Sequence, residues 1–233
     1  MIGKNRILAI TLARSGSKSI PQKNIKKINN LPLIYYTIKE ALKSKYIDNY
    51  IVSTDSNTIK RISEKYGANC PFLRPKKYSQ DKSSSVSALK HAVERIEKKE
   101  KIKYDFVIEL MCTNPLKNSF DIDECIKLLI KNKADSVIAM HQLEDHHPAR
   151  IKKIIKGKIR DFCVKEINES RRQDLRPKAY IRSGSIYALK RDYLMKKNRR
   201  YGGNNSFAYI LPNSRVINID DKFDFLIAKN LLK

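Results

Sequence analysis

The sequence predicts an α/β fold with a mainly parallel, Rossmann-like sheet and a small β-rich lobe. Two observations lead to this prediction. Apolar runs alternate with segments of helical periodicity through the first 140 residues, which is the pattern of βαβ units. After about residue 141 the runs become short and β-like, and an Arg-rich stretch follows them. The 233 residues are enough for a core that needs no disulfide or metal.

The first part of the chain contains four apolar runs that we predict to be strands, at residues 7–12, 49–53, 105–110 and 135–140. Between them, apolar residues recur at the spacing of one helix face in four stripes: Ile34, Ile38, Ala41 and Leu42; Ile59, Ile62 and Tyr66; Val86, Leu89, Val93 and Ile96; Ile122, Cys125, Ile126 and Leu129. Gly67 is the expected C-cap of the second helix, and Asp121 is an acid in the first turn of the fourth.

The later part of the chain is predicted to leave the core and return to it. The elements that we expect there are a hairpin of 151–155 and 159–164 around Gly157, strands at 185–189 and 207–211, and a closing helix over 221–232. We therefore predict three parts: a core over residues 1–140, an insertion over 141–184 and a return to the core over 185–233.

The formal net charge of +25 calls for an anionic partner, which could be nucleic acid, a membrane surface or a polyanionic small substrate. Basic residues are spread along the chain among acids, without a zinc finger or an aromatic-basic repeat, so solvated surface charge is the simpler explanation. No apolar run approaches the ~20 residues that span a bilayer. We predict no membrane insertion, no nucleic-acid partner and a cytoplasmic location.

Cysteine and histidine do not form a recognisable metal motif. The four cysteines lack a C-x-x-C pair, and we expect buried free thiols. His146 and His147 are adjacent, but no third ligand lies near them in the sequence.

The stretch "ARSGSKSIPQKN" at 13–24 follows the first predicted strand, where open α/β sheets bind ligands. Gly16 would let backbone N–H groups approach phosphate oxygens, and Arg14, Lys18 and Lys23 would add positive charge. Neither standard phosphate-loop pattern is present, and glycine and serine are also ordinary turn residues. A polar turn and a triphosphate cradle therefore both remain open.

Two more segments follow predicted strands or precede predicted helices. Asp55 in "STDS" could orient a ligand hydroxyl or cap the next helix. In "FLRPKKYSQDKSSS" at 72–85, Arg74 with Ser84 and Ser85 could hold an anion or a ribose at a helix N-terminus, and a plain N-cap explains the serines equally well.

Late in the chain, "INIDDKFDF" at 217–225 holds Asp220, Asp221 and Asp224 beside Asn218. Mg²⁺ usually takes one or two carboxylates together with substrate phosphates, so this is a candidate metal site as well as a helix start. In "RRQDLRPKAYIRSGSIY" at 171–187, four arginines could grip a carboxylate or phosphate, or form a solvated loop or subunit contact.

In this order, these stretches resemble the acylneuraminate cytidylyltransferase family, the CMP-sialic acid synthetases and relatives that activate other acidic nine-carbon sugars. The resemblance covers nearly the whole chain. It rests on the following motifs: Ala13, Arg14, Gly16, Ser17, Lys18, Lys23 and Asn24; Pro32-Leu33-Ile34; Ser53-Thr54-Asp55; Leu73-Arg74-Pro75 with Asp81 and Ser84-Ser85; Thr113 and Pro115-Leu116; Arg172-Gln173-Asp174-Leu175; Gly184 with Ile186-Tyr187; and Ile219-Asp220.

The resemblance implies a nucleotidyltransferase fold and transfer of CMP from CTP to the anomeric hydroxyl of a 2-keto-3-deoxy acid sugar, for a bacterial surface glycan, with Mg²⁺ or Mn²⁺. It also implies a homodimer, joined by the β-rich lobe. By position, Arg14, Lys23 and Asp220 would be catalytic. The implied CTP contacts are Ala13, Arg14, Gly16, Ser17, Lys23, Asn24, Arg74, Ser84 and Ser85; the implied sugar contacts are Met111, Thr113, Arg172, Gln173 and Ser183; the implied metal ligands are Asp220 and Asn218.

Three positions depart from the family pattern. Met111 replaces the glutamine of Q-P-T-S-P, Ser183 precedes Gly184 where the family commonly has N-G, and Asn218 replaces the first acid of D-x-D. The first two favour a nonulosonate other than N-acetylneuraminate, and the third predicts weaker metal binding. The alternatives are a Kdo-type cytidylyltransferase and, in a different class, a basic nucleic-acid-binding protein.

Overall fold

The computed structural model describes residues 4–166 and 171–232 and centres on one six-stranded sheet, in the order β10-β6-β9-β5-β1-β4. β9 runs antiparallel to both of its neighbours, and the remaining pairs are parallel, so the mainly parallel sheet is confirmed. The strands are β1 (Ile7–Leu12), β4 (Asn49–Ser53), β5 (Phe106–Leu110), β6 (Ser136–Gln142), β9 (Tyr180–Lys190) and β10 (Ser206–Ile210). All six predicted core strands are present, and β9 extends well beyond its predicted range.

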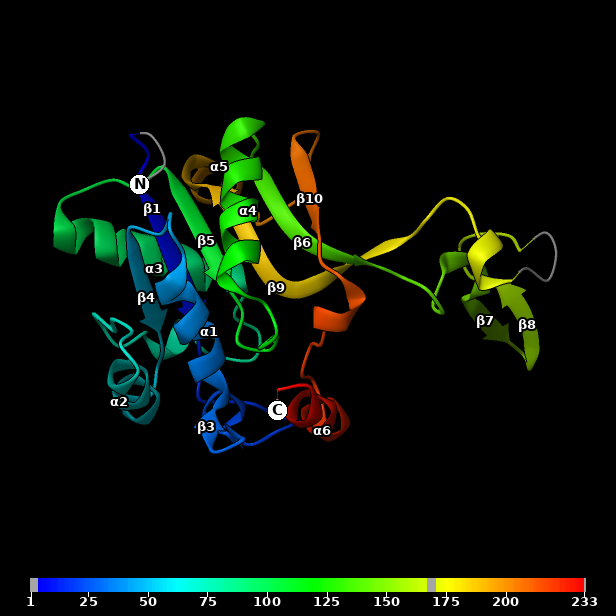
Figure 1. Ribbon diagram of the computed structural model, residues 1–233, viewed down its shortest axis with the longest axis horizontal. Coiled ribbons are helices and arrows are strands. Elements are labelled where there is room, and N and C mark those ends of the chain that lie inside the picture. Colours follow the sequence, from blue (N-terminus) through cyan, green and yellow to red (C-terminus); the bar gives the residue numbers. More distant parts are fainter. Residues whose placement is uncertain (1–3, 167–170, 233) are drawn as a thin grey trace.

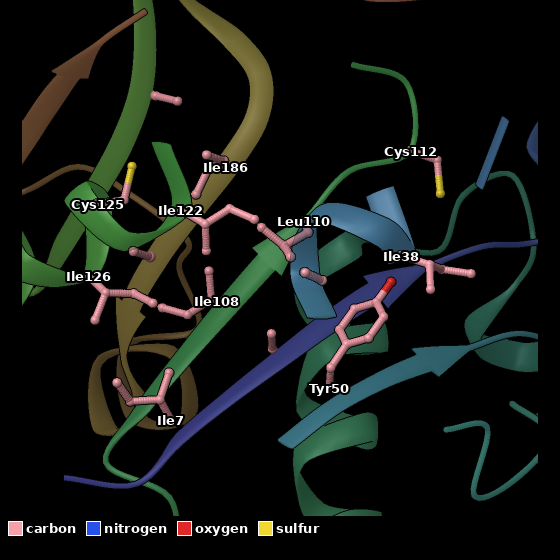
Figure 2. Close-up of a cluster of buried hydrophobic side chains, with 14 of the residues drawn as sticks. Ile7, Ile38, Tyr50, Ile108, Leu110, Cys112, Ile122, Cys125, Ile126 and Ile186 are labelled. Carbon is pink, nitrogen blue, oxygen red and sulfur yellow. The ribbon is translucent and has the colours of Figure 1, made fainter. Parts of the chain in front are cut away.

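Helices cover both faces of this sheet (Figure 1). α1 (Leu33–Lys43), α2 (Asn57–Lys65) and α4 (Ser119–Lys131) pack on one face through the apolar stripes that the sequence shows. α3 (Ser85–Glu100) and α5 (Arg191–Lys197) pack on the other. Figure 2 shows the first core, in which Ile38 of α1 and Ile122 and Ile126 of α4 lie over strand residues such as Ile108. α5 was not predicted, because its seven residues present too short a periodic pattern.

Two helix ends follow from local chemistry. Gly67 adopts a left-handed backbone, with φ of 91°, and its N–H donates to the Glu64 carbonyl at 3.0 Å, as expected of a C-cap. Asn118 and Asp121 form a capping box at the start of α4. Asp121 is also fully buried and accepts hydrogen bonds from Tyr209 and Arg215, so it joins α4 to the β10 end of the chain.

A third hydrophobic core joins the C-terminal segment to the region between β1 and α1. β2 (Lys27–Ile28) and β3 (Leu31–Pro32) form a small hairpin, and α6 (Lys222–Leu231) packs against it. Ile20 and Ile28 contact Ile217 and Ile219 in this core. Segment 217–220 is thereby held beside the loop that follows β1.

Residues 143–166 and 171–179 form an arm that projects from the sheet (Figure 1). β6 and β9 pair along its base, and β7 (Lys152–Ile155) and β8 (Lys158–Asp161) form the predicted hairpin at its end, with Gly157 at φ of 74°. The second hairpin strand stops at Asp161, short of the predicted residue 164. Short 3₁₀ turns complete the chain: η1 (Lys23–Ile25), η2 (Lys76–Tyr78), η3 (Pro148–Arg150), η4 (Arg172–Asp174) and η5 (Asn213–Arg215).

No helix in the described ranges is long and apolar enough to cross a membrane. Cys70, Cys112 and Cys125 are buried free thiols as expected, whereas Cys163 on the arm is exposed, so that expectation was wrong for this residue. His147 is buried and uses both ring nitrogens, toward the Pro177 carbonyl at 2.8 Å and the Ala149 N–H at 3.3 Å. It therefore fastens the arm.

Candidate active site

Two neighbouring cavities lie at the carboxyl ends of β1 and β5. The first, which we call the inner cavity, measures about 280 Å³. It is bounded by residues of the loop after β1, the 74–85 segment and the loop after β5. The outer cavity measures about 350 Å³ and is bounded mainly by residues 14–24. Arg14, Asn24 and Thr113 line both. This edge of the sheet is where open α/β folds bind ligands.

The loop after β1 is shaped by Asp55, which follows β4. The Asp55 carboxylate accepts hydrogen bonds from the Ser15 backbone N–H and from the Ser15 hydroxyl, each at 2.8 Å. Asp55 is therefore not the cap of α2, a role that Ser56 takes by accepting from the Ile59 N–H. Asp55 at the end of β4 therefore has a structural role, which is to fix the conformation of the loop after β1.

Gly16 and Lys23 occupy the outer cavity, together with Ser17 and Lys18. A Cβ at Gly16 would meet no protein atom within 4 Å, so the chain itself places no steric demand on this position. The space beside the loop is open to a ligand. Asn24 donates to the Arg14 carbonyl at 2.9 Å and fixes the far end of the loop.

The inner cavity is polar on the side formed by the 74–85 segment. Arg74 is buried, and its Nε donates to the Ser79 hydroxyl at 2.9 Å; burial lowers the pKa of its guanidinium. Ser84 is the N-cap of α3, accepting from the Ser87 N–H, and it still lines the cavity beside Ser85. Ser84 can therefore act as an N-cap and, with Ser85, still be available to a ligand. A guanidinium and hydroxyls at a helix N-terminus form a surface suited to a polar heterocycle or an anion.

The loop after β5 closes the inner cavity and is held from behind by Lys117. Lys117 is 1% exposed, and its ammonium donates to the Met111 carbonyl at 2.6 Å, the Asn114 carbonyl at 2.7 Å and the Thr37 hydroxyl at 2.8 Å. Met111 and Thr113 of this loop face the cavity. The Thr113 hydroxyl is buried without a hydrogen-bond partner, which is the state expected of a group that meets a ligand.

Segment 217–220 contacts Lys23 and Thr113, two residues that line the outer cavity. Lys23 Nζ lies 2.7 Å from the Ile219 carbonyl and 3.5 Å from the Asp220 carboxylate, and the Ile219 N–H donates to the Thr113 carbonyl at 2.8 Å. The structure thus brings Lys23, Asp220 and Thr113 together from three distant segments. Asp221 caps α6 together with Asp224, which leaves Asp220 as the acid of this segment that pairs with Lys23.

Asn218 lies beside Asp220 and Gly184. Its amide nitrogen donates to the Asp220 carboxylate, and its amide oxygen lies 3.1 Å from where a Cβ of Gly184 would stand. Gly184 has φ of 63°, so the position needs glycine on both counts. In this arrangement Asn218 orients Asp220 as a hydrogen-bond donor.

Six of the residues assigned by resemblance line neither cavity: Asp220, Asn218, Ala13, Ser183, Arg172 and Gln173. Ala13 is buried and donates through its backbone to the Ser53 carbonyl, and the Ser183 hydroxyl is buried against the Ala139 carbonyl. Arg172 and Gln173 line a separate hollow on the arm, where Arg172 pairs with Glu144. Within one chain, the arm residues do not reach the site.

Four further residues contribute to the site although the sequence did not single them out for a role: Tyr78, Asp81, Glu109 and Lys117. Tyr78 stacks near His91, with ring centroids 4.7 Å apart, and lines the inner cavity. Glu109 was visible as a lone acid inside the apolar run "FVIEL". A charge inside a buried strand is a usable signal, because such a group needs a partner that the strand itself does not supply.

That partner is Arg200, from the segment between α5 and β10. Arg200 Nη1 lies 2.5 Å from Glu109 Oε2, and its guanidinium stacks 4.5 Å above the Tyr187 ring. Glu109 is 1% exposed, and burial raises the pKa of its carboxyl while Arg200 opposes the increase. Of the pair, Glu109 lines the inner cavity, as Met111 does.

We expect Arg200→Ala to lower the free energy of unfolding by about 3–5 kcal/mol, because it leaves a buried carboxylate without its cation. Without Arg200 the pKa of Glu109 rises further, so the folded state takes up a proton more readily than the unfolded chain. The loss should therefore be smaller at about pH 5 than at about pH 8. Urea denaturation at both values measures it. A double variant, Glu109→Leu with Arg200→Met, should recover most of the loss; equal loss in both proteins would contradict the prediction.

Comparisons with known proteins identify the family of this chain. The cytidylyltransferase family model matches residues 8–191. The chain is 34% identical over 242 residues to pseudaminic acid cytidylyltransferase of Campylobacter jejuni, covering 97% of this chain and 96% of that protein. It is 32% identical to CMP-N,N'-diacetyllegionaminic acid synthase of the same species, covering 97% and 94%.

Among solved structures, CMP:2-keto-3-deoxy-manno-octonic acid synthetase complexed with CTP superimposes with a TM-score of 0.71 at 16% identity, covering 98% of each chain. That likeness confirms the predicted nucleotidyltransferase fold. Fold and site together define the protein as a nucleotidyltransferase enzyme. The chain belongs to the cytidylyltransferase family.

Proposed function

We propose that this protein transfers CMP from CTP to the anomeric hydroxyl of an acidic nine-carbon 2-keto-3-deoxy sugar. The hydroxyl oxygen forms a bond to the α-phosphorus and gives up its proton to solvent, the bond from that phosphorus to the bridging oxygen breaks, and pyrophosphate leaves. The observation that carries the proposal is that Arg14 lines two adjoining cavities, while Lys23 lines the outer one and pairs with Asp220. Such a reaction depends on positioning and charge neutralisation, which these groups supply.

The dimensions and chemistry of the two cavities suit the two halves of CTP. The inner cavity offers Arg74, Tyr78 and the α3 serines to a base and ribose. The outer cavity offers Arg14, Lys18 and Lys23 to the phosphates, with open space above Gly16. The α-phosphate would then lie near Arg14, where the cavities meet.

The sugar would approach from Met111 and Thr113. The relatives named for pseudaminic and legionaminic acid, together with Met111 in place of the family's glutamine, favour a nonulosonate of that kind over N-acetylneuraminate. Because both named relatives use modified sugars, we propose bacterial surface glycan synthesis as the purpose, in the cytoplasm where CTP is available.

A divalent metal, Mg²⁺ or Mn²⁺, fits the residues around Asp220. No cluster of three His, Cys, Asp or Glu side chains suited to a metal occurs within residues 4–166 and 171–232. Asp220 nevertheless offers one carboxylate beside the cavity that holds three cations, and Mg²⁺ is commonly bound by one or two carboxylates plus substrate phosphates. When bound, the metal would neutralise charge on the leaving pyrophosphate. Asp220 would hold it, and Asn218 would orient Asp220.

We expect Asn218→Asp to lower the Mg²⁺ concentration for half-maximal activity by about tenfold, because a second carboxylate strengthens a hard-cation site. Without metal, the same variant should melt at a lower temperature than wild type, since two adjacent carboxylates repel each other. Activity titrations and thermal unfolding with and without chelator measure both effects. Asn198→Asp, at the end of α5 and outside both cavities, makes the same charge change and serves as the control. An unchanged Mg²⁺ requirement would contradict Asp220 as the ligand.

The arm supports a homodimer. Its hairpin exposes Ile154 at 75%, Ile159 at 67% and Phe162 at 61%, and a two-stranded sheet has little stability of its own. A second copy of the chain would cover this surface and would bring Arg172 and Gln173 of one arm toward the site of the other subunit. A solution mass of twice 27.0 kDa that falls to the monomer value in Ile154→Asp would support it.

The test of the proposed function is pyrophosphate release with CTP, Mg²⁺ and a panel of acid sugars: pseudaminic, legionaminic and N-acetylneuraminic acids and Kdo. We expect turnover with a nine-carbon acid other than N-acetylneuraminate. Turnover with Kdo alone would support the eight-carbon alternative. No turnover with any sugar, together with tight and steeply salt-dependent binding of duplex nucleic acid, would replace the enzyme with a nucleic-acid-binding protein.

A further inference from the structure

Asp81 holds two of the cations that the proposed function assigns to the triphosphate. One carboxylate oxygen of Asp81 lies 3.1 Å from Arg14 Nη1, and the other lies 2.9 Å from Lys18 Nζ. Arg14 Nη1 also donates to the neighbouring Gln80 carbonyl at 3.2 Å. Each carboxylate oxygen thus binds one cation, which is how a phosphate group would engage the same pair.

These contacts span the boundary between the two cavities. Asp81 lines the inner cavity, Lys18 lines the outer cavity, and Arg14 lines both. A nucleoside triphosphate with its base in one cavity and its phosphates in the other would engage Arg14 and Lys18, the two side chains that Asp81 binds. The ion pairs and the proposed ligand therefore compete for the same place.

The loop does not need Asp81 to keep its shape. Asp55 holds the backbone and hydroxyl of Ser15, and Asn24 holds the Arg14 carbonyl. Asp81 touches only the ends of the two cationic side chains, from a segment more than sixty residues away in the chain. A contact of this kind sets where the side chains point.

The ion pairs are also weak enough to exchange. Lys18 and Asp81 are largely exposed, with side-chain exposures of 79% and 51%, so water and salt screen their attraction. A triphosphate brings several negative charges and more acceptor oxygens than one carboxylate, and arginine can bind it through two parallel hydrogen bonds. The ligand should displace Asp81 rather than be excluded by it.

We propose that Asp81 is a positioning residue that holds Arg14 and Lys18 at the mouth between the cavities until the triphosphate displaces it. This inference rests on the proposed function, because it takes the outer cavity as the phosphate site. In the free enzyme, the Asp81 carboxylate partly neutralises Arg14 and Lys18 and competes with the triphosphate for them. Binding of the triphosphate replaces this carboxylate with phosphate oxygens. Asp81 thereby lowers the apparent affinity for CTP.

The experiment measures binding of inorganic tripolyphosphate and of CTP by calorimetry without sugar, for wild type and Asp81→Asn. We expect the variant to bind both ligands about three- to tenfold more tightly, since the competing conformation is removed. The KM for CTP should fall by a similar factor while kcat stays within about twofold of wild type. Asp81→Glu, which retains the charge, should bind as wild type does.

The matched control is Asp192→Asn, which makes the same charge change on α5. Asp192 pairs with Arg191 and Lys196, and the Arg191 N–H donates to the Asp105 carbonyl at the opposite end of β5 from the site. Equal tightening in this control would reduce the effect to net charge and overturn the proposal. Weaker or unchanged binding in Asp81→Asn would also overturn it.

A double-mutant comparison isolates the contact itself. In a Lys18→Ala background, Asp81→Asn should tighten tripolyphosphate binding by a smaller factor, because one of the two pairs is already missing. The same factor in both backgrounds would count against the proposal. Because tripolyphosphate binding needs no sugar and no turnover, the absence of pyrophosphate release from every sugar would refute the proposed function while leaving the result on Asp81 readable.

Discussion

Replacing Arg14 with alanine should lower kcat for CMP transfer by about two to three orders of magnitude, the loss that follows removal of one fixed charge or donor at a developing anion. Arg14 is the residue that lines both cavities and meets Asp81, so it stands where the reacting phosphate is proposed to lie. The larger effect should be on kcat than on KM, because charge accumulates in the transition state. Pyrophosphate release at saturating CTP measures it.

The control for Arg14→Ala is Arg61→Ala, which removes an exposed arginine from α2, away from both cavities. Its kcat should match that of wild type. Arg14→Lys should recover only part of the activity, since an ammonium lacks the planar pair of donors that grips phosphate. Unchanged turnover in Arg14→Ala would remove this residue from the mechanism.

Replacing Lys117 with methionine should destabilise the protein and disorder the loop that carries Met111 and Thr113. The change leaves the buried Asn114 carbonyl without its ammonium donor, at a cost of about 1–3 kcal/mol, and weakens the satisfaction of the partly buried Met111 carbonyl. Because those carbonyls belong to Met111 and Asn114, the cavity wall should shift, and the KM for both substrates should rise. Chemical denaturation and steady-state kinetics measure the two effects. Lys127→Met, which removes an exposed lysine from α4, is the control.

Lys117 should also make stability depend on pH with a defined sign. Burial lowers its pKa from 10.5 to about 8, against the opposing influence of Cys112, Glu40 and Asp121. Between these values the unfolded chain binds more protons than the folded one, so this residue raises the free energy of unfolding as pH increases, by roughly 3 kcal/mol in full. The stability of wild type relative to Lys117→Met should rise from about pH 8 to about pH 10. Comparing the two proteins cancels the other titrating groups; a constant difference would show that Lys117 keeps an ordinary pKa.

Much of the fold was predictable because local periodicity reflects burial. The apolar run at 105–110 became β5, and the stripe through Ile122 and Ile126 became the buried face of α4. α5 was missed because seven residues hold fewer than two periods of the pattern. The antiparallel direction of β9 could not be foreseen either, since strand direction depends on which neighbours the strand meets after the arm returns.

The site was predictable where its residues lie in one loop and not where they meet across the fold. Arg14, Lys23 and Asn24 were found because one short stretch after β1 carries them. The roles of Asp55 and Asp81 depend on contacts with that loop from other segments. The resemblance placed Arg172 and Gln173 with the sugar, but the arm carries them away from the site of their own chain.

By itself, the sequence determined the class of fold, the cationic loop after the first strand and the late acid at Asp220, because periodicity, turn residues and charge are local properties. Only the tertiary structure decided that Asp220 meets Lys23, that Lys117 supports the loop of Thr113 from behind and that Asp81 pairs with Arg14 and Lys18. These contacts join residues far apart in the chain. Their partners are fixed by the packing of the three cores, which no single stretch of sequence encodes.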